Sequence, residues 1–251
     1  MKFASGDRIV SVVIPCLNEE EPIAAVVHEV AAQGVDEVIV VDNGSTDQTA
    51  SRAATAGARV ISEPTRGYGC ACAAGLAGVR ADSEIVCFLD GDGSDVASFL
   101  AAIVTPLADG SADFVIGSRL RGKREPGSMT PQQLVAGWIA GVLLRVAYGA
   151  RYTDMSPFRA MRVATLRALG MREKTYGWNL EMQMRVAADR LRIVEIPVDH
   201  RLRQGGESKV SGNLVAGLQA AWKISTTFAR LAVSLRTPSP TPINEARKGD
   251  A

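Results

Sequence analysis

Two aspartates separated by one glycine, Asp90 and Asp92, are the first residues whose types and spacing suggest chemistry. They follow an apolar run, residues 85–89, that is typical of a buried strand. Two carboxylates at a strand end can bind one hard divalent cation, and phosphate oxygens of a ligand can complete its coordination shell. The same residues are common in turns, but the position after a buried strand favours the metal site. Asp95 is expected to be the N-cap of the helix that follows.

Two more polar segments follow apolar runs. Asp42 comes directly after the run 37–41 and can accept hydrogen bonds from a base N–H or a ribose hydroxyl. Glu19 and Glu20 follow the run 9–15. Acidic residues near a helix start also stabilise the helix dipole, so a structural role and a ligand-binding role both remain open for this pair.

A scaffold must bring these segments together. Along residues 9–116, short apolar runs rich in β-branched residues alternate with segments of helical spacing. This alternation predicts an α/β fold, a Rossmann-like and mostly parallel sheet with helices on both faces. Ligands of such sheets bind at the carboxyl ends of the strands. We therefore expect the segments after Ile14, Val41, Leu89 and Ile116 to surround one crevice.

The rest of the chain is less regular. It predicts a helix at 131–148, a strand at 156–161, a helix at 178–189, a strand at 192–198 and a C-terminal amphipathic helix at 213–235. The polar, proline-containing tail, residues 237–251, is expected to be disordered. We expect one domain over residues 1–236, with a nucleotide-binding half at 1–117 and an acceptor-binding half at 118–236.

The three polar segments, in this order, resemble the motifs of family 2 glycosyltransferases, which have the GT-A fold. The matching motifs are P-x-x-N-E, V-D-(D/N)-G-S-x-D and D-x-D, here at residues 15–19, 41–47 and 90–92. The resemblance implies a nucleotide-sugar donor, Mg²⁺ or Mn²⁺ as cofactor, and inversion at the anomeric carbon. It also implies that Asp90 and Asp92 bind the metal and the diphosphate, with Asp92 acting in catalysis.

The same resemblance assigns residues to the donor. Four of them would surround the nucleoside: Pro15, Asn18, Glu19 and Asp42. Arg66 stands where relatives carry a lysine in a short loop near the donor. The chain departs from the family pattern at Asn43, where many relatives have aspartate, at Ser94, where many have glutamine, and at Pro157, which replaces a glycine.

The second half of the chain resembles dolichol-phosphate mannosyltransferase-like enzymes. Three segments carry this resemblance: residues 153–159, 176–181 and 203–213. The last matches R-x-x-G-E-S-K-x-x-G-N and places Arg203, Ser208 and Lys209 on one loop. Guanidinium and ammonium groups suit phosphate recognition. We expect Arg119, Arg203 and Lys209 to be catalytic residues, and Ser208 to donate a hydroxyl. The alternative is a solvated basic loop.

The chemistry of the acceptor decides whether a base is needed. A phosphate monoester is largely a dianion at neutral pH, so it needs alignment and charge neutralisation but no general base. A hydroxyl acceptor needs a carboxylate base, for which Asp154 and Glu181 are the candidates. The chain lacks the E-D pair and the Q-x-x-R-W motif of many relatives with hydroxyl acceptors. We expect transfer of a hexose from a UDP- or GDP-sugar to a polyprenyl-phosphate-type lipid, with a hydroxyl acceptor as the alternative.

Composition limits the possible partners of the protein and its cellular compartment. The formal net charge of +1 gives no overall attraction to nucleic acid, which we do not expect as a partner. The four cysteines lack metal-site spacing and are expected to be buried in a reducing compartment. No signal peptide or membrane span is predicted, so we expect a cytoplasmic protein. The helices at 131–148 and 213–235 can attach to a membrane surface, pack on the sheet, or form a homodimer.

Two other functions compete with this prediction. A sugar-1-phosphate nucleotidyltransferase would carry a glycine-rich basic segment after its first strand, but residues 18–21 are Asn-Glu-Glu-Glu here. A non-catalytic nucleotide-sugar-binding adaptor needs no intact metal site. The presence of Asp90, Asp92 and Lys209 argues against the adaptor, and a turnover assay would decide.

Overall fold

The computed structural model of this 251-residue chain describes residues 8–205 and 214–235. The predicted tail and the loop that carries Ser208 and Lys209 lie outside the described residues. All four cysteines are buried and free, as expected from their spacing.

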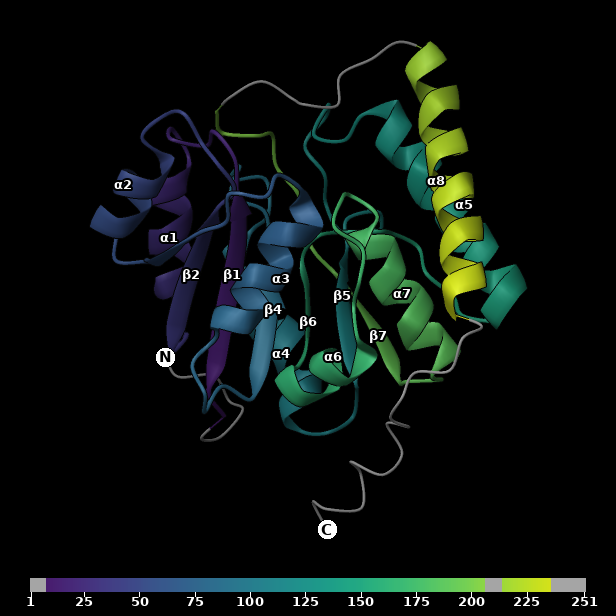
Figure 1. The fold of residues 1–251 in the computed structure, drawn as a ribbon, viewed down its shortest axis with the longest axis horizontal. Helices are drawn as coiled ribbons and strands as arrows, with labels where there is room; N and C mark the ends of the chain where they lie inside the picture. Colours follow the sequence, from purple (N-terminus) through teal and green to yellow (C-terminus); the bar gives the residue numbers. More distant parts are fainter. Residues whose placement is uncertain (1–7, 206–213, 236–251) are drawn as a thin grey trace.

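A mixed sheet forms the centre of the molecule (Figure 1). Across the described residues its order is β3-β2-β1-β4-β6-β5-β7. The strands are β1 (Val10–Cys16), β2 (Glu37–Asp42), β3 (Arg59–Ser62), β4 (Ile85–Phe88), β5 (Phe114–Ser118), β6 (Arg159–Arg162) and β7 (Ile193–Pro197). All neighbours pair in parallel except β6, which lies antiparallel between β4 and β5. The predicted α/β fold with a mostly parallel sheet is confirmed.

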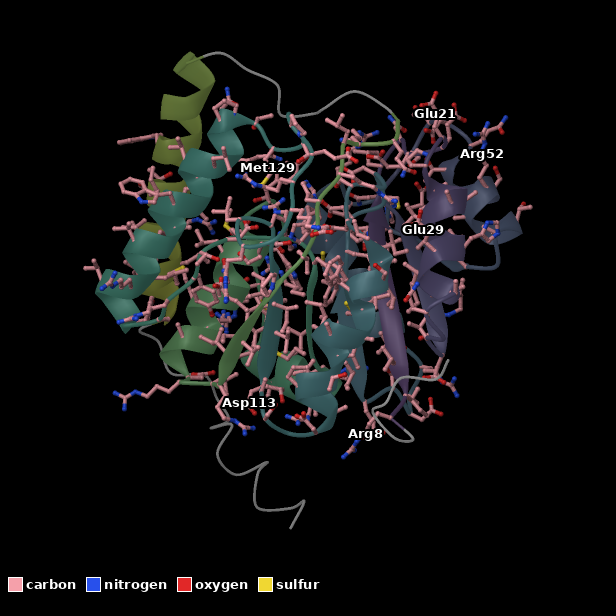
Figure 2. All side chains as sticks on the ribbon, turned by 180° about the vertical axis from the view of Figure 1, so that it is seen from behind. Arg8, Glu21, Glu29, Arg52, Asp113 and Met129 are labelled. Carbon is pink, nitrogen blue, oxygen red and sulfur yellow. The ribbon has the colours of Figure 1, made fainter. Side chains whose placement is uncertain are left out.

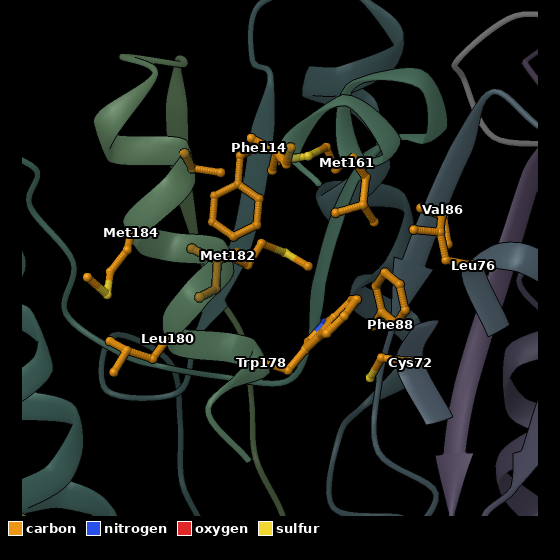
Figure 3. Packing of buried hydrophobic residues seen from close by; sticks show 14 of the residues in the cluster. Cys72, Leu76, Val86, Phe88, Phe114, Met161, Trp178, Leu180, Met182 and Met184 are labelled. Carbon is orange, nitrogen blue, oxygen red and sulfur yellow. The ribbon is translucent and has the colours of Figure 1, made fainter. Parts of the chain in front are cut away.

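Helices cover both faces of the sheet, because alternate side chains of each buried strand point to opposite faces. The helices are α1 (Ile23–Ala31), α2 (Thr49–Thr55), α3 (Tyr68–Gly78), α4 (Leu100–Ala108), α5 (Pro131–Tyr148), α6 (Val163–Leu169), α7 (Trp178–Ala188) and α8 (Leu214–Leu235), with a 3-10 turn η1 (Ala97–Phe99). Val12 and Ile14 of β1 join the core under α1 and α4, whereas Val13 joins the core under α3 and α7. Figure 3 shows the second core, where Trp178 of α7 points toward Phe88 of β4.

The antiparallel strand β6 determines what reaches the site. Arg159, its first residue, is in register with Phe88 of β4 and with Ile116 of β5. The chain before β6 therefore passes over the carboxyl ends of β4 and β5 and delivers residues 153–158 there. Helix α6, which directly follows β6, has only seven residues and was not expected from the sequence.

Helices α5 and α8 pack against each other and against α7, and run side by side at one edge of the molecule (Figure 1). Helix α5 has the predicted bounds. It begins with a capping box between Thr130 and Gln133 and ends at Gly149, whose φ of 71° is left-handed. Within the described residues, no helix is both long enough and apolar enough to cross a membrane.

Candidate active site

The loops after β1 and β2 are joined into one wall of the site. Asn18 has a positive φ of 55°, which turns its backbone N–H toward the Ser45 hydroxyl at 2.9 Å. Its side-chain oxygen accepts from the N–H of Thr46 at 2.9 Å. The N–H of Glu19 donates to the Thr49 hydroxyl at 2.8 Å. The segments after β1 and β2 therefore lie together, as the strand order β2-β1-β4 requires.

Asp42 and Asn43 shape the second loop. Asp42 Oδ1 accepts from the N–H of Ser45 at 3.1 Å. The side-chain amide of Asn43 donates to the carbonyls of Glu63 and Thr65, and its oxygen accepts from the N–H of Gly67 at 2.7 Å. An aspartate cannot donate these two bonds, which explains the departure from the family pattern at this position. The amide of Asn43 thereby holds the loop that carries Arg66.

Arg66 lies on the exposed side of this loop, where it donates to the carbonyl of Gly44 at 3.0 Å. Behind it, the ring of Tyr68 stacks on that of Tyr176 with centroids 6.2 Å apart. Burial, followed by the charge of Asp90, raises the pKa of the Tyr68 phenol. Tyr68 therefore forms an aromatic wall between the Arg66 loop and the carboxylates, a role that the sequence did not indicate.

Asp90 and Asp92 lie directly after β4 at the centre of the site. The Oδ1 atom of Asp90 is buried and accepts no hydrogen bond within the described residues. Burial of this carboxyl, followed by the charges of Asp92 and Asp95, raises the pKa of Asp90 well above its usual value. Asp92 instead accepts from the N–H and hydroxyl of Ser94, at 2.9 and 2.6 Å.

This arrangement suits a divalent cation, because a buried carboxylate oxygen without a donor is stabilised by a positive charge. Among the described residues, no group of three or more His, Cys, Asp or Glu side chains could hold a metal ion. Asp90 and Asp92 together offer two carboxylates, so oxygens of a bound diphosphate would have to complete the shell of any cation held there.

The segment 201–205 lies against the D-x-D loop. The N–H of Gln204 donates to the carbonyl of Asp92 at 3.0 Å, which holds this segment in place. A guanidinium nitrogen of Arg203 is 3.7 Å from Asp92 Oδ2, and another pairs with Glu19. The structure thus brings Arg203 beside Asp92. Glu19, expected near the nucleoside, is the partner of this arginine. Pro15, also expected near the nucleoside, is a buried residue of β1.

Arg119 lies at the end of β5, but its geometry differs from the expectation. Its Nε and Nη2 atoms both donate to Asp154 at 2.8 Å, and its backbone N–H donates to the same carboxylate at 2.9 Å. Both side chains are buried. Most of the guanidinium fork is therefore engaged, so Arg119 is placed to support the acidic centre rather than to hold an acceptor phosphate by its fork.

Hydrogen bonds hold both candidate bases in place. Burial alone would raise the pKa of Asp154, but the hydrogen bonds and charge of Arg119 outweigh it and hold this pKa below its usual value. Glu181 is fully buried. Its carboxylate accepts from the N–H groups of Arg172 and Glu173 and from the side chain of Arg185. Glu181 therefore fixes the loop before α7.

Two more residues near the carboxylates were missed or misread. The expectation that Asp95 caps a helix is wrong, because η1 has no side-chain cap and Asp95 accepts from the N–H of Asp90 at 3.1 Å. His200 is buried with its Nδ1 3.8 Å from Asp95 Oδ1. The only sequence signal for His200 was its place in a loop that carries the other predicted site residues.

A small pocket opens at the loop after β1. It has a volume of about 140 Å³ and is lined by Asn18, Glu19, Glu20, Glu21, Pro22 and Asp47. A larger hollow of about 290 Å³ lies between α1 and α2, and no predicted site residue lines it. Figure 2 shows Glu21 at the same end of the molecule as Met129, and Arg8 and Asp113 at the opposite end. The site therefore occupies the carboxyl end of the sheet.

Comparisons with known proteins agree with this geometry. The model of the family described as glycosyl transferase family 2 matches residues 11–170. An uncharacterized glycosyltransferase of Mycobacterium tuberculosis is 40% identical over 88% of this chain and 99% of its own length. The undecaprenyl-phosphate mannosyltransferase of Micrococcus luteus is 32% identical over 84% of this chain and 95% of its own.

A solved structure has the same fold. The glucosyl-3-phosphoglycerate synthase of Mycobacterium tuberculosis, in complex with Mn²⁺, uridine diphosphate and glucosyl-3-phosphoglycerate, aligns with a TM-score of 0.68. It is 26% identical, and the match covers 91% of this chain and 81% of that one. The fold, the three strand-end motifs and these matches together show that this chain is a glycosyltransferase that belongs to family 2.

Proposed function

We propose that this glycosyltransferase moves a hexose from a UDP- or GDP-sugar to a lipid phosphate of the polyprenyl type. The observation that carries the proposal is the engagement of both candidate bases. Asp154 is held by Arg119, and Glu181 is held by two backbone N–H groups and Arg185. An acceptor that is already an anion needs neither carboxylate, because its own oxygen is the nucleophile.

Residues on the donor side would divide the work. Asp90 and Asp92 would hold Mg²⁺ or Mn²⁺, which when bound neutralises the charge that develops on the leaving diphosphate. The loops around Asn18 and Asp42 would hold the nucleoside, and Arg66 would contact the diphosphate from its exposed loop. The Mn²⁺ and uridine diphosphate in the solved glucosyl-3-phosphoglycerate synthase support this assignment.

The acceptor side would depend on cations. Arg203 lies between Glu19 and Asp92, so an incoming phosphate can replace either carboxylate as the partner of its guanidinium. We assign Ser208 and Lys209 to the same phosphate from the loop motif alone. Arg119 would partly neutralise the acidic centre, because its positive charge stabilises the ionised forms of Asp90 and Asp95.

One observation favours phosphoglycerate as a second candidate acceptor. The solved synthase that shares this fold was captured with glucosyl-3-phosphoglycerate, a product that also carries a phosphate. The relative from Micrococcus luteus is named for undecaprenyl phosphate, and it matches nearly the full length of both chains. We favour the lipid, and with it attachment to the cytoplasmic surface of a membrane.

A transfer screen tests the proposal. Purified protein would be offered UDP-glucose, UDP-galactose, UDP-GlcNAc and GDP-mannose with Mn²⁺ or Mg²⁺, and either a short polyprenyl phosphate or 3-phosphoglycerate. We expect one donor to glycosylate the lipid phosphate, with turnover abolished by EDTA and by Asp92→Ala. Transfer to phosphoglycerate alone would replace the lipid with the second acceptor. Donor binding without turnover on any acceptor would favour the adaptor.

A further inference from the structure

Helix α5 presents an apolar stripe to solvent. The exposed residues recur at helical spacing and are Val135, Trp138, Val142 and Val146, of which Trp138 is 67% and Val146 81% exposed. The opposite side of the helix is buried through small residues such as Gly137 and Ala140. The other side of α5 therefore packs against the core of the domain, and the stripe has no partner within the described residues.

Helix α8 repeats this feature. Its inner face carries Phe228 and Leu231, which are buried, and the ring of Phe228 meets Tyr148 of α5 at 6.3 Å. Its outer face carries Trp222, which is 73% exposed, and Val233, which is 69% exposed. These two residues are eleven positions apart, about three helical turns, and so lie in one row. Two adjacent helices therefore each expose a tryptophan and a β-branched side chain.

The charged residues of this helix pair indicate what kind of surface it can bind. Neither α5 nor α8 contains an aspartate or glutamate. Arg230 of α8 is paired with Glu173, whereas Arg145 and, just beyond α5, Arg151 are exposed, and neither of these two forms an ion pair within the described part of the chain. Two copies meeting through this helix pair would bring these arginines together, and neither helix supplies a carboxylate to pair with them. An anionic lipid surface supplies the opposite charge and receives the tryptophans at the headgroup level.

We propose that the α5–α8 pair docks this enzyme on an anionic membrane surface, with Trp138 and Trp222 as the anchors. This inference deepens the proposed function and rests on its lipid acceptor. Position supports it, because α5 begins at Pro131, at the end of the loop that starts at Arg119 beside the acidic centre. Met129, at the start of α5, lies at the same end of the molecule as the site (Figure 2). A membrane at this helix pair would bring lipid phosphates to the acceptor side.

Vesicle flotation of the full chain, without donor or metal, tests the docking surface. Vesicles of phosphatidylcholine alone are compared with vesicles of equal parts phosphatidylcholine and phosphatidylglycerol. We expect binding to the anionic vesicles, lowered by about tenfold or more in Trp138→Ser and in Trp222→Ser, since burying a large apolar side chain is worth roughly that factor. Trp138→Phe should retain most of the binding. Because both tryptophans are exposed, the melting temperature should not change.

The charge is tested with a matched pair of variants. Arg145→Gln should weaken binding to anionic vesicles by about fivefold and leave binding to neutral vesicles unchanged. Arg167→Gln changes an exposed arginine on α6, away from the helix pair, and should have no effect. Undiminished binding of both tryptophan variants would overturn the proposal. So would a dimer in sedimentation that Trp138→Ser converts to a monomer, because this face would then be a self-interface.

The same proteins separate this proposal from the proposed function. If vesicle binding fails but a short, water-soluble polyprenyl phosphate is still glycosylated, the docking surface is wrong and the function stands. If the tryptophan variants lose binding but no lipid phosphate is glycosylated by the wild type, the docking surface stands and the acceptor assignment is wrong.

Discussion

At the scale of single residues, the site has an excess of carboxylates that the described part of the chain does not balance with positive charge. Asp90, Asp92 and Asp95 lie within one short loop, and the buried Oδ1 of Asp90 has no donor among the described residues. Arg119 is near but is engaged by Asp154. Such a centre is costly until a cation arrives, which makes both its stability and its ligand dependence measurable.

The substitution Asp90→Asn should therefore stabilise the metal-free protein. Removing the charge relieves repulsion by Asp92 and Asp95 and the cost of burial, by about 1–2 kcal/mol of unfolding free energy. The same change removes a metal ligand, so Mn²⁺ with UDP should raise the melting temperature of the wild type but not of the variant. Urea unfolding and thermal unfolding check the two parts. A less stable metal-free variant would show that the Asp90 charge is already well compensated.

His200 gives a pH dependence of stability with a definite sign. Burial, followed by the charge of Arg119, lowers the pKa of His200 to about 4, whereas a histidine in the unfolded chain titrates near 6.5. Below about 6.5 the unfolded chain binds a proton that the folded protein refuses. The contribution of His200 to stability is thus complete above the unfolded pKa and is lost as the pH falls toward the folded one.

The measurement is urea unfolding of the wild type and His200→Gln at about pH 7 and about pH 5. The wild type should lose about 2 kcal/mol more unfolding free energy than the variant across this interval. The comparison is needed because the pKa of Asp95, raised to about 6 chiefly by burial, has the opposite effect on stability. Equal losses in the two proteins would mean that His200 keeps its ordinary pKa.

At the scale of elements, the loop between α6 and α7 connects the C-terminal helix α8 to the segment that carries Arg66 and Tyr68. Glu173 pairs with Arg230 of α8 and accepts from the Thr175 hydroxyl at 2.7 Å. On the other side of this loop, the carbonyl of Lys174 accepts from the N–H of Cys70 in α3 at 3.1 Å. A side chain at Gly69 would clash with the carbonyl of Glu173. The start of α3 therefore rests directly on residues that α8 holds.

The substitution Glu173→Gln should loosen this support and raise the KM for the donor by roughly threefold to tenfold, with a smaller change in kcat. The reason is that Arg66 and Tyr68 lie on the segment that the loop supports. Steady-state kinetics with varied donor concentration separate the two constants. Glu84→Gln, which breaks an ion pair with Arg8 at the opposite end of the molecule, is the matched control (Figure 2). An equal effect in both variants would contradict a specific link.

The elements also show how far the sequence could predict this protein. Strands β1, β2 and β4 and helix α5 were predicted because apolar periodicity and caps are local signals. Helix α6 was missed because seven residues hold too few helical turns to show a period. The antiparallel direction of β6 was not predicted, since strand pairing depends on contacts between distant residues. The pairing of Arg119 with Asp154 follows from that direction and was missed for the same reason.

At the scale of the whole molecule, the proposed function would divide the reaction between two halves of the sheet. The loops after β2, β1 and β4 would bind the donor, and the loops around β6, β5 and β7 would bind the acceptor. Asp90 and Asp92 follow β4, where the two halves meet. Motifs identify the donor half well, because each occupies one strand end. The acceptor half depends on loops from β5, β6 and β7, whose meeting point no single motif describes.

The absence of an available base among the described acceptor-side residues predicts the pH profile of the reaction. With a lipid phosphate, kcat/KM should rise as the acceptor loses its second proton, with an apparent pKa near 6, and stay level above it.

Asp95 also has a pKa of about 6 in the metal-free protein, so the profile alone does not identify the titrating group. An acceptor analogue whose phosphoryl group has a lower second pKa distinguishes the acceptor from Asp95 as the titrating group. If the acceptor is the group that titrates, the rising limb moves to lower pH with the analogue, and Asp154→Asn leaves its position unchanged. A limb that stays in place would assign the titration to a group of the enzyme, such as Asp95, and not to the acceptor.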